Sequence, residues 1–454
     1  MFNRSARRLT MPHVAFSAAI LLSAPVAQAN GAFPAVSQLV ADPSDPNHLL
    51  LRSNFGLLTT RDSGRSWDLV CEAGIGYQNI EPPVAVLSDG TTLAALSDGI
   101  AHGSSNECEF VLGTGIASYV ADVSRVPGAV TAAVAVSVDF DQNSSQVWHT
   151  TDGGASWSTW GVALDELNAA TLDVASADAS ELYVSGVSQS GTVRGVLAHS
   201  GDGGKTWTRF DVPGASKVSA PYIAAITAND PSTVYVRLSG TPGRLLVTHD
   251  GGRHFDDVLD FTGPFDGFAL SPDGRYALAS GRTDGVWRAR TSDLAFEQLS
   301  CAHLRCLSWT GAGLFACADE FQAGFLVGES ADLGLSFEPR LHLSCVRGPL
   351  QCPDQSPVAQ ACSVVWPMIS EQLGTDCADA SSFEPSTECS AASGASGSGG
   401  NGAIGAAGAA NGAGSGGSPN RPHGGCSLGA TSGAPGSSLL TLASLLWLTK
   451  RRRP

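Results

Sequence analysis

Five aspartates occupy the same place in a pattern that recurs along the chain. The pattern reads Ser or Thr, any, Asp, any, Gly, any, Ser, Thr or His, aromatic, and its aspartates are Asp62, Asp152, Asp202, Asp250 and Asp332. Carboxylates of this kind can act as general acids or bases, or can bind Ca²⁺. A catalytic or metal site needs one such copy, whereas five copies are typical of a structural element. We therefore interpret these aspartates as turn residues.

Each of the five aspartates is followed by a glycine and an aromatic residue in fixed register. An Asp side chain can accept hydrogen bonds from the amides of its own turn, Gly permits a positive φ, and an aromatic ring can bury itself between strands. The pattern therefore predicts a tight turn between the third and fourth strands of a repeated unit. The structural residues are Asp62, Gly64 and Trp67; Asp152, Gly154 and Trp157; Asp202, Gly204 and Trp207; Asp250, Gly252 and Phe255; and Asp332, Gly334 and Phe337.

Other candidates for chemistry stand alone. Asp122, Asp139 and Asp173 are isolated carboxylates that their spacing does not rank as catalytic. Asp139 begins like a calcium loop, but Ser144 and Thr150 stand where such a loop needs Gly and Glu. The sequence contains no nucleophile elbow, no zinc-protease helix motif and no phosphate-binding loop. It therefore predicts no metal and no cofactor, and leaves any catalytic residue unknown.

The eleven cysteines are predicted to serve structure rather than metal binding. Their spacing is irregular and lacks Cys-x-x-Cys pairs, which favours disulfides over zinc. Cys71 and Cys108 lie near the outer strands of consecutive units and could pair with each other, while the connectivity of the others stays open. Apart from Cys426 in the tail, the disulfide candidates are Cys71, Cys108, Cys301, Cys306, Cys317, Cys345, Cys352, Cys362, Cys377 and Cys389.

The spacing of the aromatic residues defines the repeated unit. Two gaps are twice as long as the others, and Phe110 and Phe296 stand where degenerate copies of the pattern would fall. The step is then about 45 residues, and a period of 40–50 with short apolar runs and Gly-rich turns is typical of a four-stranded propeller blade. The fold class is predicted to be all-β, a seven-bladed β-propeller over residues 34–343.

The turn pattern resembles the Asp-box, also called the bacterial neuraminidase repeat. The resemblance covers about 310 residues and is specific for the fold, but it says little about activity. Asp-box propellers occur in sialidases, in xyloglucan-cleaving glycosidases, in sortilin-type receptors and in photosystem II assembly factors. Sortilin-type receptors also carry a Cys-rich module after a propeller of ten blades, so that likeness concerns layout alone.

The enzymes that share this repeat fit the chain poorly. Sialidases have six blades and normally open with an Arg-Ile-Pro motif, which is missing here, and none of the six tyrosines lies in the context of their nucleophile. In the xyloglucanase-like family the catalytic carboxylates come from two propellers that face each other across a cleft. One propeller does not assure a complete acid–base pair. A glycoside hydrolase, xyloglucanase-like or less favourably sialidase-like, remains the alternative hypothesis.

Both ends of the chain resemble targeting segments. Residues 1–29 resemble a secretory signal peptide, with Arg4, Arg7 and Arg8 before a short apolar stretch and Ala27-Gln28-Ala29 as the cleavage site. Residues 391–437 form a Gly/Ala/Ser-rich tether, and residues 438–454 form a short apolar segment with a basic end. Tether, Gly425-Cys426, apolar segment and terminal arginines together are similar to the sorting tail of myxobacterial surface proteins. That resemblance implies processing and lipid attachment at Cys426.

Composition and charge narrow the range of possible fold classes and binding partners. The 454 residues include 53 Gly but only 3 Met, which favours a β-rich, turn-rich chain. The formal net charge is −16, and residues 1–29 and 427–454 contribute only positive charges, so the part between them is more acidic still. A protein that grips phosphate backbones needs a positive face, so the charge argues against nucleic acid as a partner.

These observations predict an exported propeller that is held at the cell surface or outer membrane. Residues 344–390 are expected to form a small disulfide-held module that closes or caps the propeller, and the membrane is contacted only through the tail. We expect a non-catalytic binding or adaptor module for a protein or polysaccharide ligand. The central face of the ring and the loops that join the blades are the expected contact sites.

Overall fold

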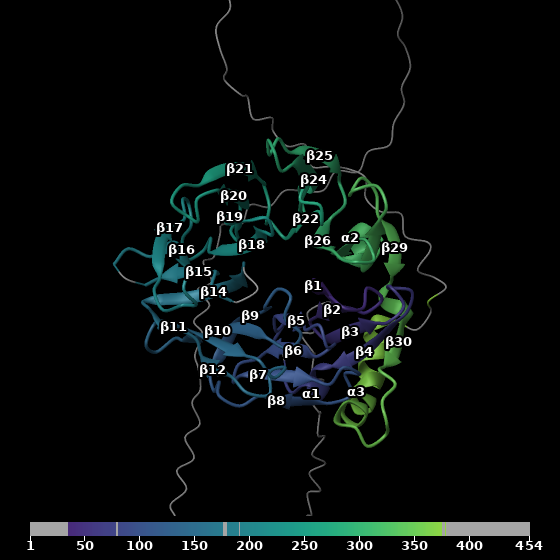
Figure 1. Ribbon diagram of the computed structural model, residues 1–454. Coiled ribbons are helices and arrows are strands. Elements are labelled where there is room, and N and C mark those ends of the chain that lie inside the picture. Colours follow the sequence, from purple (N-terminus) through teal and green to yellow (C-terminus); the bar gives the residue numbers. More distant parts are fainter. Residues whose placement is uncertain (1–34, 79, 176–178, 190, 375–376, 378–454) are drawn as a thin grey trace, which may run out of the picture. The chain divides into compact units, whose positions relative to one another are not determined.

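The fold was analysed in a computed structural model that describes residues 35–78, 80–175, 179–189, 191–374 and 377. All of these belong to one compact unit, residues 1–394. Seven antiparallel sheets surround a central axis, and the chain is a seven-bladed β-propeller, as the repeat spacing predicts (Figure 1). No helix within these ranges is long and apolar enough to cross a membrane. The predicted signal peptide, the tether, Cys389, Cys426 and the apolar tail lie outside the described residues.

Each blade is a four-stranded meander whose strands follow one another in sequence and in space. Blade one contains β1 (Val36–Ala41), β2 (Leu49–Ser53), β3 (Gly56–Thr60) and β4 (Trp67–Cys71). Blade two contains β5 (Val84–Val86), β6 (Thr92–Ala95), β7 (Ile100–Gly103) and β8 (Phe110–Leu112). Blade three contains β9 (Tyr119–Arg125), β10 (Ala133–Asp139), β11 (Ser144–Thr150) and β12 (Ser158–Thr159), and β13 (Leu164–Asp165) also pairs with β11.

The other four blades repeat the same plan. Blade four contains β14 (Leu167–Val174), β15 (Leu182–Ser188), β16 (Arg194–Ser200) and β17 (Thr208–Asp211). Blade five contains β18 (Pro221–Thr227), β19 (Asp230–Leu238), β20 (Arg244–Thr248) and β21 (Asp256–Asp260). Blade six contains β22 (Gly267–Leu270), β23 (Tyr276–Gly281), β24 (Gly285–Arg290) and β25 (Glu297–Ser300). Blade seven contains β26 (Leu304–Trp309), β27 (Leu314–Ala318), β28 (Val327–Ser330) and β29 (Glu338–Leu341).

The first strand of every blade lies nearest the axis, and side chains rather than ladders join these strands to one another. Gln38 of β1 exchanges hydrogen bonds with both backbone groups of Val84 on β5, at 3.1 and 3.2 Å. The amide of Ile223 on β18 donates to the Thr171 hydroxyl on β14 at 2.9 Å. The inner strands therefore keep their backbone edges toward the axis, and polar side chains there hold neighbouring blades together.

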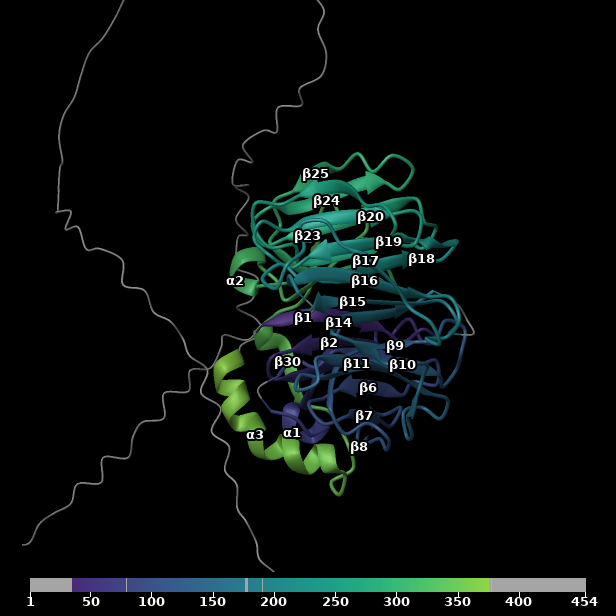
Figure 2. The same cartoon turned by 90° about the vertical axis from the view of Figure 1, so that its left-hand side faces the viewer.

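The ring is closed by the segment after blade seven, which we call the clasp (residues 343–374). A 3₁₀ turn (Leu343–Cys345) leads into β30 (Val346–Pro349), which pairs in parallel with β4 as a fifth strand of blade one. Helix α3 (Pro357–Leu373) then packs beside the short helix α1 (Glu72–Ile75) (Figures 1 and 2). The largest hydrophobic cluster of the described fold joins blades one, two and seven to this clasp. Another short helix, α2 (Glu320–Ala323), lies between β27 and β28.

Local sequence explains the clasp helix. Ser356 accepts a hydrogen bond from the amide of Ala359, and Pro357 fills the first helical position, which are standard start signals. The buried residues Val358, Cys362, Ile369 and Leu373 recur at helical spacing and face the blades. The cysteine pattern of residues 344–390 does not by itself indicate this helix.

The disulfides tie the clasp to the first two blades. Cys71 pairs with Cys362 and Cys108 pairs with Cys352, across 291 and 244 residues of sequence. The suggested Cys71–Cys108 pair is therefore wrong: both residues do lie on the outer side of consecutive blades, but each faces the clasp instead of the other.

Two further disulfides join cysteines that are closer to each other in sequence. Cys306 and Cys317 are bonded at paired positions of β26 and β27, and Cys345 is bonded to Cys377. Cys301 is disulfide-bonded as well. An ion pair also holds the clasp to blade one, because Arg347 of β30 forms a bidentate contact with the Asp68 carboxylate on β4.

Candidate functional site

The central channel is the place where all seven blades meet, and it has two distinct ends. At the hairpin end lie the turns between the first and second strands, together with the turns between the third and fourth strands. At the crossover end lie the turns between the second and third strands and the connections from one blade to the next. The two ends carry different side chains.

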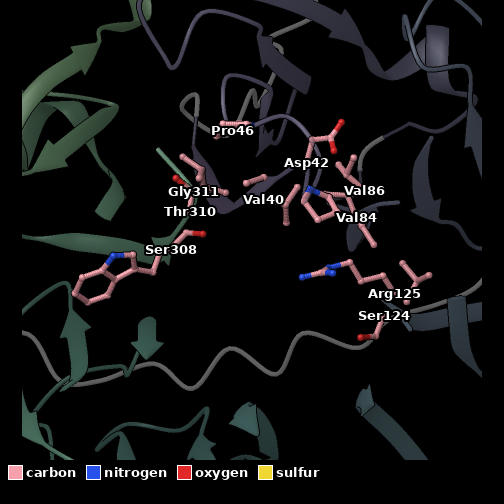
Figure 3. Close-up of a pocket in the computed structure, with 16 residues that line it drawn as sticks. Val40, Asp42, Pro46, Val84, Val86, Ser124, Arg125, Ser308, Thr310 and Gly311 are labelled. Carbon is pink, nitrogen blue, oxygen red and sulfur yellow. The ribbon is translucent and has the colours of Figure 1, made fainter. Parts of the chain in front are cut away.

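A pocket of about 590 Å³ opens at the hairpin end, where β1, β5, β9 and β26 finish. Figure 3 shows Arg125 extending from β9 into its open space, toward the side lined by Ser308 and Thr310. Much of the floor is aliphatic, including Val84 and Val86. The pocket is large enough for a small ligand, but a single basic group gives it little chemical definition.

One wall of this pocket is held by a buried chain of charged groups between blades one and two. His48 contacts the Asp42 carboxylate at 3.2 Å and the Glu107 carboxylate at 2.6 Å. Burial alone would lower the pKa of His48, but the hydrogen bond and charge of Glu107 outweigh it and raise that pKa. Burial alone would raise the pKa of Asp42, but hydrogen bonds from Ser44 and His48 bring it below its usual value. Because His48 is fully buried, the chain joins blades instead of contacting a substrate.

Two arginines occupy equivalent positions near the crossover end of blades one and five, each one residue before the end of its second strand. Arg52 of β2 stands opposite Gln38 of β1, and its Nε donates to the Ser37 hydroxyl at 3.0 Å. Arg237 of β19 stands opposite Tyr222 of β18, and its guanidinium carbon lies 4.7 Å from the centre of that ring.

The two guanidinium groups are largely desolvated. Burial lowers the pKa of Arg52, which the carboxylates of Glu81 and Asp122 partly restore and the like charge of Arg237 lowers further. Burial also lowers the pKa of Arg237. Blades one and five are not neighbours, so this repulsion acts across the channel. Within the described ranges neither guanidinium has a carboxylate at ion-pairing distance, and Asp266 is bound instead by Arg282.

Exposed aromatic side chains lie at the same end of the channel. Tyr119 at the start of β9 and Phe140 in the next turn have exposed fractions of 42 % and 59 %, and their ring centres are 5.5 Å apart. Burial raises the pKa of Tyr119, with smaller contributions from Tyr222 and Asp122, which places all three close to one another. The crossover end thus combines cationic groups with exposed aromatic surface.

Asp122 and Asp173, two of the isolated acids, occupy neighbouring inner strands. Both oxygens of Asp122 accept backbone amides, from Val123 at 2.9 Å and from Leu172 of the next blade at 3.0 Å. Burial raises the pKa of Asp122 to about 7 and raises that of Asp173 as well. One oxygen of Asp173 accepts from the Ser124 hydroxyl of the preceding blade at 3.0 Å. These acids therefore link blades three and four.

The third isolated acid is a turn residue. Asp139 accepts hydrogen bonds from the amides of Asp141 and Gln142 at 3.0 Å, at the end of β10. No contact among the described residues brings it together with Asp122 and Asp173. Among the described residues, no group of three or more His, Cys, Asp and Glu side chains is arranged to hold a metal ion.

The five Asp-box turns lie between the third and fourth strands of blades one, three, four, five and seven, as the pattern predicts. In the first copy, Asp62 accepts from the Thr60 hydroxyl at 2.8 Å, from the Ser66 amide at 2.9 Å and from the Ser66 hydroxyl at 2.6 Å. Gly64 has φ +85°, and Trp67 Nε1 donates to its carbonyl at 3.0 Å. All five aspartates have a lowered pKa, because the turn donates to each carboxylate. The residues stand apart at the rim and form turns.

Sequence reasoning missed the two axial arginines. Each is a single basic residue in an otherwise apolar second strand, in LLLRS (residues 49–53) and in VYVRL (residues 234–238). A charged residue in such a strand must be paired or must reach an opening, so this signal was available. What the sequence lacks is the information that these two strands face the same axis.

The fold and these turns define the class: an Asp-box seven-bladed β-propeller. A family model described as photosynthesis system II assembly factor YCF48 matches residues 141–291, about a third of the chain. No curated protein sequence matches the chain.

Solved structures are similar at the level of the fold. An ancestral GH74 enzyme has 16 % identity and a TM-score of 0.51, with 68 % of this chain and 47 % of that chain covered. The chain thus spans about half the length of that enzyme. The extracellular domain of a hybrid two-component system from B. thetaiotaomicron has 11 % identity and a TM-score of 0.46, with 63 % and 37 % covered.

Proposed function

We propose that this protein is an exported, surface-held binding module without catalytic activity, and that it binds a protein or polysaccharide ligand at the crossover end of the channel. One observation carries the proposal. Arg52 and Arg237 occupy equivalent second-strand positions near the crossover end and have no carboxylate at ion-pairing distance in the described part of the chain, and the exposed rings of Tyr119 and Phe140 lie at the same end. Arginine and aromatic side chains are the groups that most often anchor ligands and partners.

The axial acids support binding over catalysis. A glycosidase needs a pair of carboxyl groups that can reach the substrate, one as an acid and the other as a base or nucleophile. Both oxygens of Asp122 are occupied by backbone amides, and Asp173 is tied to Ser124 and Val174. Releasing them for catalysis would leave strand amides without partners.

Export is part of the proposal and rests on the signal-like residues 1–29 and on the cysteines. Four disulfides are found within the described residues, and disulfides form and persist in oxidising compartments. Surface attachment rests on the tail, with Cys426 as the proposed lipid and processing site.

A glycoside hydrolase is the second candidate, because the pKa of Asp122 is raised to about 7. A carboxyl group that holds its proton near neutral pH is what a general acid requires. The likeness to the ancestral GH74 enzyme bears on the fold alone.

A single assay separates the two candidates. The purified protein is incubated with xyloglucan, other neutral and acidic polysaccharides and sialylated glycans, and retained sugar and released sugar are scored separately. Retention without release supports the binding module. Release that disappears in folded Asp122→Asn and Asp173→Asn variants, but persists in an Asp202→Asn variant, would refute it and establish the hydrolase.

A further inference from the structure

We propose that the crossover end of blades two to four is a docking surface for a protein whose own surface is apolar and basic. This partner class deepens the binding function proposed above and rests on it. The surface is built from the turns between second and third strands and from the connections between blades, which are the parts of a propeller that the fold itself constrains least.

Exposed large hydrophobic side chains are distributed unevenly between the two ends of the propeller. Among the described residues of the blades, those at the hairpin end are Val130, Leu333 and Leu335. The crossover end has more of them, and all but Phe321 of α2 lie on the three consecutive blades two to four or on the connections that leave these blades (Figure 1). We call these residues the crossover arc: Val111, Leu112, Tyr119, Phe140, Val162, Val193 and Val218.

The fold does not require these side chains to be apolar. Val193 and Val218 stand among small and polar residues of their loops, where a polar side chain would serve the chain equally well. Val218 is 86 % exposed, so it contributes little to the core. Tyr119 and Phe140 contact each other, with ring centres 5.5 Å apart, and both are still open to solvent. Apolar groups that gather on one exposed face mark an interaction surface.

The charged residues at the same end are mostly acidic. In the described turns, connections and terminal strand residues of the blades at this end, the exposed basic residues are Arg194 and Lys217, and Arg194 is already paired with Asp211 at 2.8 Å. The exposed acidic residues there are Glu81, Asp98, Asp141, Asp165, Glu166, Asp211 and Asp260. A partner that presents lysines and arginines around an apolar centre matches this surface, whereas an acidic partner is repelled.

The same features disfavour the other occupants of such a surface. Sugar rings pack against flat aromatic faces, but most side chains of the crossover arc are aliphatic. A membrane that contains anionic lipids repels an acidic face. A second copy of this chain would bring two acidic faces together. A basic and apolar protein surface satisfies the hydrophobic and the charged groups at once.

The experiment uses two designed peptides as probes. Both form amphipathic helices with leucine on one face, and the polar face carries lysine in one peptide and glutamate in the other. Each labelled peptide is titrated with the purified full chain, and binding is followed by fluorescence anisotropy. We expect the Leu/Lys peptide to bind at least about tenfold more tightly than the Leu/Glu peptide, and its binding to weaken as salt is added.

Substitutions locate the binding. Phe140→Ser and Val218→Ser combined should weaken binding of the Leu/Lys peptide by about tenfold or more, because both remove exposed apolar groups of the crossover arc. Val130→Ser is the matched control: Val130 is 58 % exposed in the same blade as Phe140 but at the hairpin end, so binding should stay within about twofold of wild type. Asp141→Asn and Asp165→Asn combined should reduce the salt dependence. Circular dichroism and thermal unfolding verify that every variant is folded.

The outcomes separate this inference from the function on which it rests. Equal binding of the two peptides, no binding of either, or binding that the Phe140 and Val218 substitutions leave unchanged overturns the partner class. Self-association of the chain, or protection of the crossover arc by phosphatidylcholine vesicles in amide hydrogen exchange, overturns it in favour of a second copy or a membrane if the same substitutions abolish it.

The polysaccharide assay described above completes the comparison. Retention of a polysaccharide by a chain that binds neither peptide overturns the partner class but leaves the binding function intact. Release of shortened sugars overturns the non-catalytic function itself, even where the Leu/Lys peptide binds at the crossover arc.

Discussion

Removing the Cys71–Cys362 disulfide tests how the clasp closes the ring. In the chain-entropy description, a disulfide stabilises the fold by the entropy of the loop that it closes in the unfolded state. With Cys108–Cys352 intact, that loop runs from Cys71 to Cys108 and back from Cys352 to Cys362, about 47 residues. The expected cost of Cys71→Ala/Cys362→Ala is then about 4 kcal/mol at 25 °C.

The same reasoning predicts that the two clasp disulfides are not additive. Once Cys71–Cys362 is absent, the Cys108–Cys352 bond closes a loop spanning 244 residues, and its loss costs about 5–6 kcal/mol. The second removal should therefore cost more than the first. Since domains have about 5–15 kcal/mol of stability in total, the variant without both bonds should lose the closed ring, whereas the first variant should keep it.

The measurement is equilibrium unfolding in guanidinium chloride followed by tryptophan fluorescence, combined with amide hydrogen exchange. Exchange should rise first in β1, β4 and β26, the strands at the junction of blades one and seven. Asp202→Ala, which removes turn hydrogen bonds in blade four away from that junction, is the control and should leave the junction protected. The reasoning fails if the first removal costs under about 1 kcal/mol, or if either clasp bond can be removed second at no extra cost.

Three further substitutions test the local arguments. Asp62→Ala should cost about 1–2 kcal/mol of folding stability through the lost turn hydrogen bonds. Because the pKa of Asp62 is lowered in the folded state, the wild-type turn loses that stability as pH falls through this pKa. The difference in melting temperature between wild type and variant should therefore narrow in acid. The raised pKa of His48 means that its stabilisation is fully present below pH 6.5 and is lost as pH rises through its folded pKa, so wild-type melting should fall with rising pH more steeply than that of His48→Gln. At Gly56, with φ +139°, an added Cβ would lie 2.3 Å from the Val70 carbonyl oxygen, so Gly56→Ala should cost about 3 kcal/mol or more of the free energy of unfolding, measured with denaturant. Gly76 is the control, because its φ is +101° and an added Cβ would meet nothing within 4 Å. Gly76→Ala should cost about 1 kcal/mol.

The blades could be predicted because their signal is local and repeated. The Asp-box joins Asp62 to residues within four positions of it, so its hydrogen bonds can be read from eight consecutive residues. The same spacing located the degenerate copies, whose aromatic residues Phe110 and Phe296 begin or precede the fourth strands β8 and β25. A pattern of this kind defines both the turn and the period of the fold.

The closure of the ring could not be predicted in the same way. Strand β30 pairs with β4, and Cys362 reaches Cys71 across 291 residues, while nothing near either cysteine specifies the partner. Sequence proximity favoured Cys71 with Cys108 instead. Once β30 adds to the outer edge of blade one, α3 must follow along that blade, and the cysteine positions then match.

The roles of the charged residues on the inner strands were hidden for a related reason. Asp122 and Asp173 are visible as isolated acids in sequence, but their roles depend on amides of neighbouring blades, such as Leu172. Arg52 and Arg237 come from blades that are not adjacent, so no local pattern relates them. Their common axis appears only after all seven blades have been placed.

Ring closure and ligand recognition are therefore parts of one problem. Arg52 belongs to blade one, which the clasp holds against blade seven, whereas Arg237 belongs to blade five. Their separation is not set by any direct contact between blades one and five, but by the whole circuit of blades between them. A loosened junction would spread that circuit and move the two guanidinium groups apart, even with every blade still folded. The clasp thus does more than protect the fold against unfolding, because it also sets how the first and last blades meet around the channel.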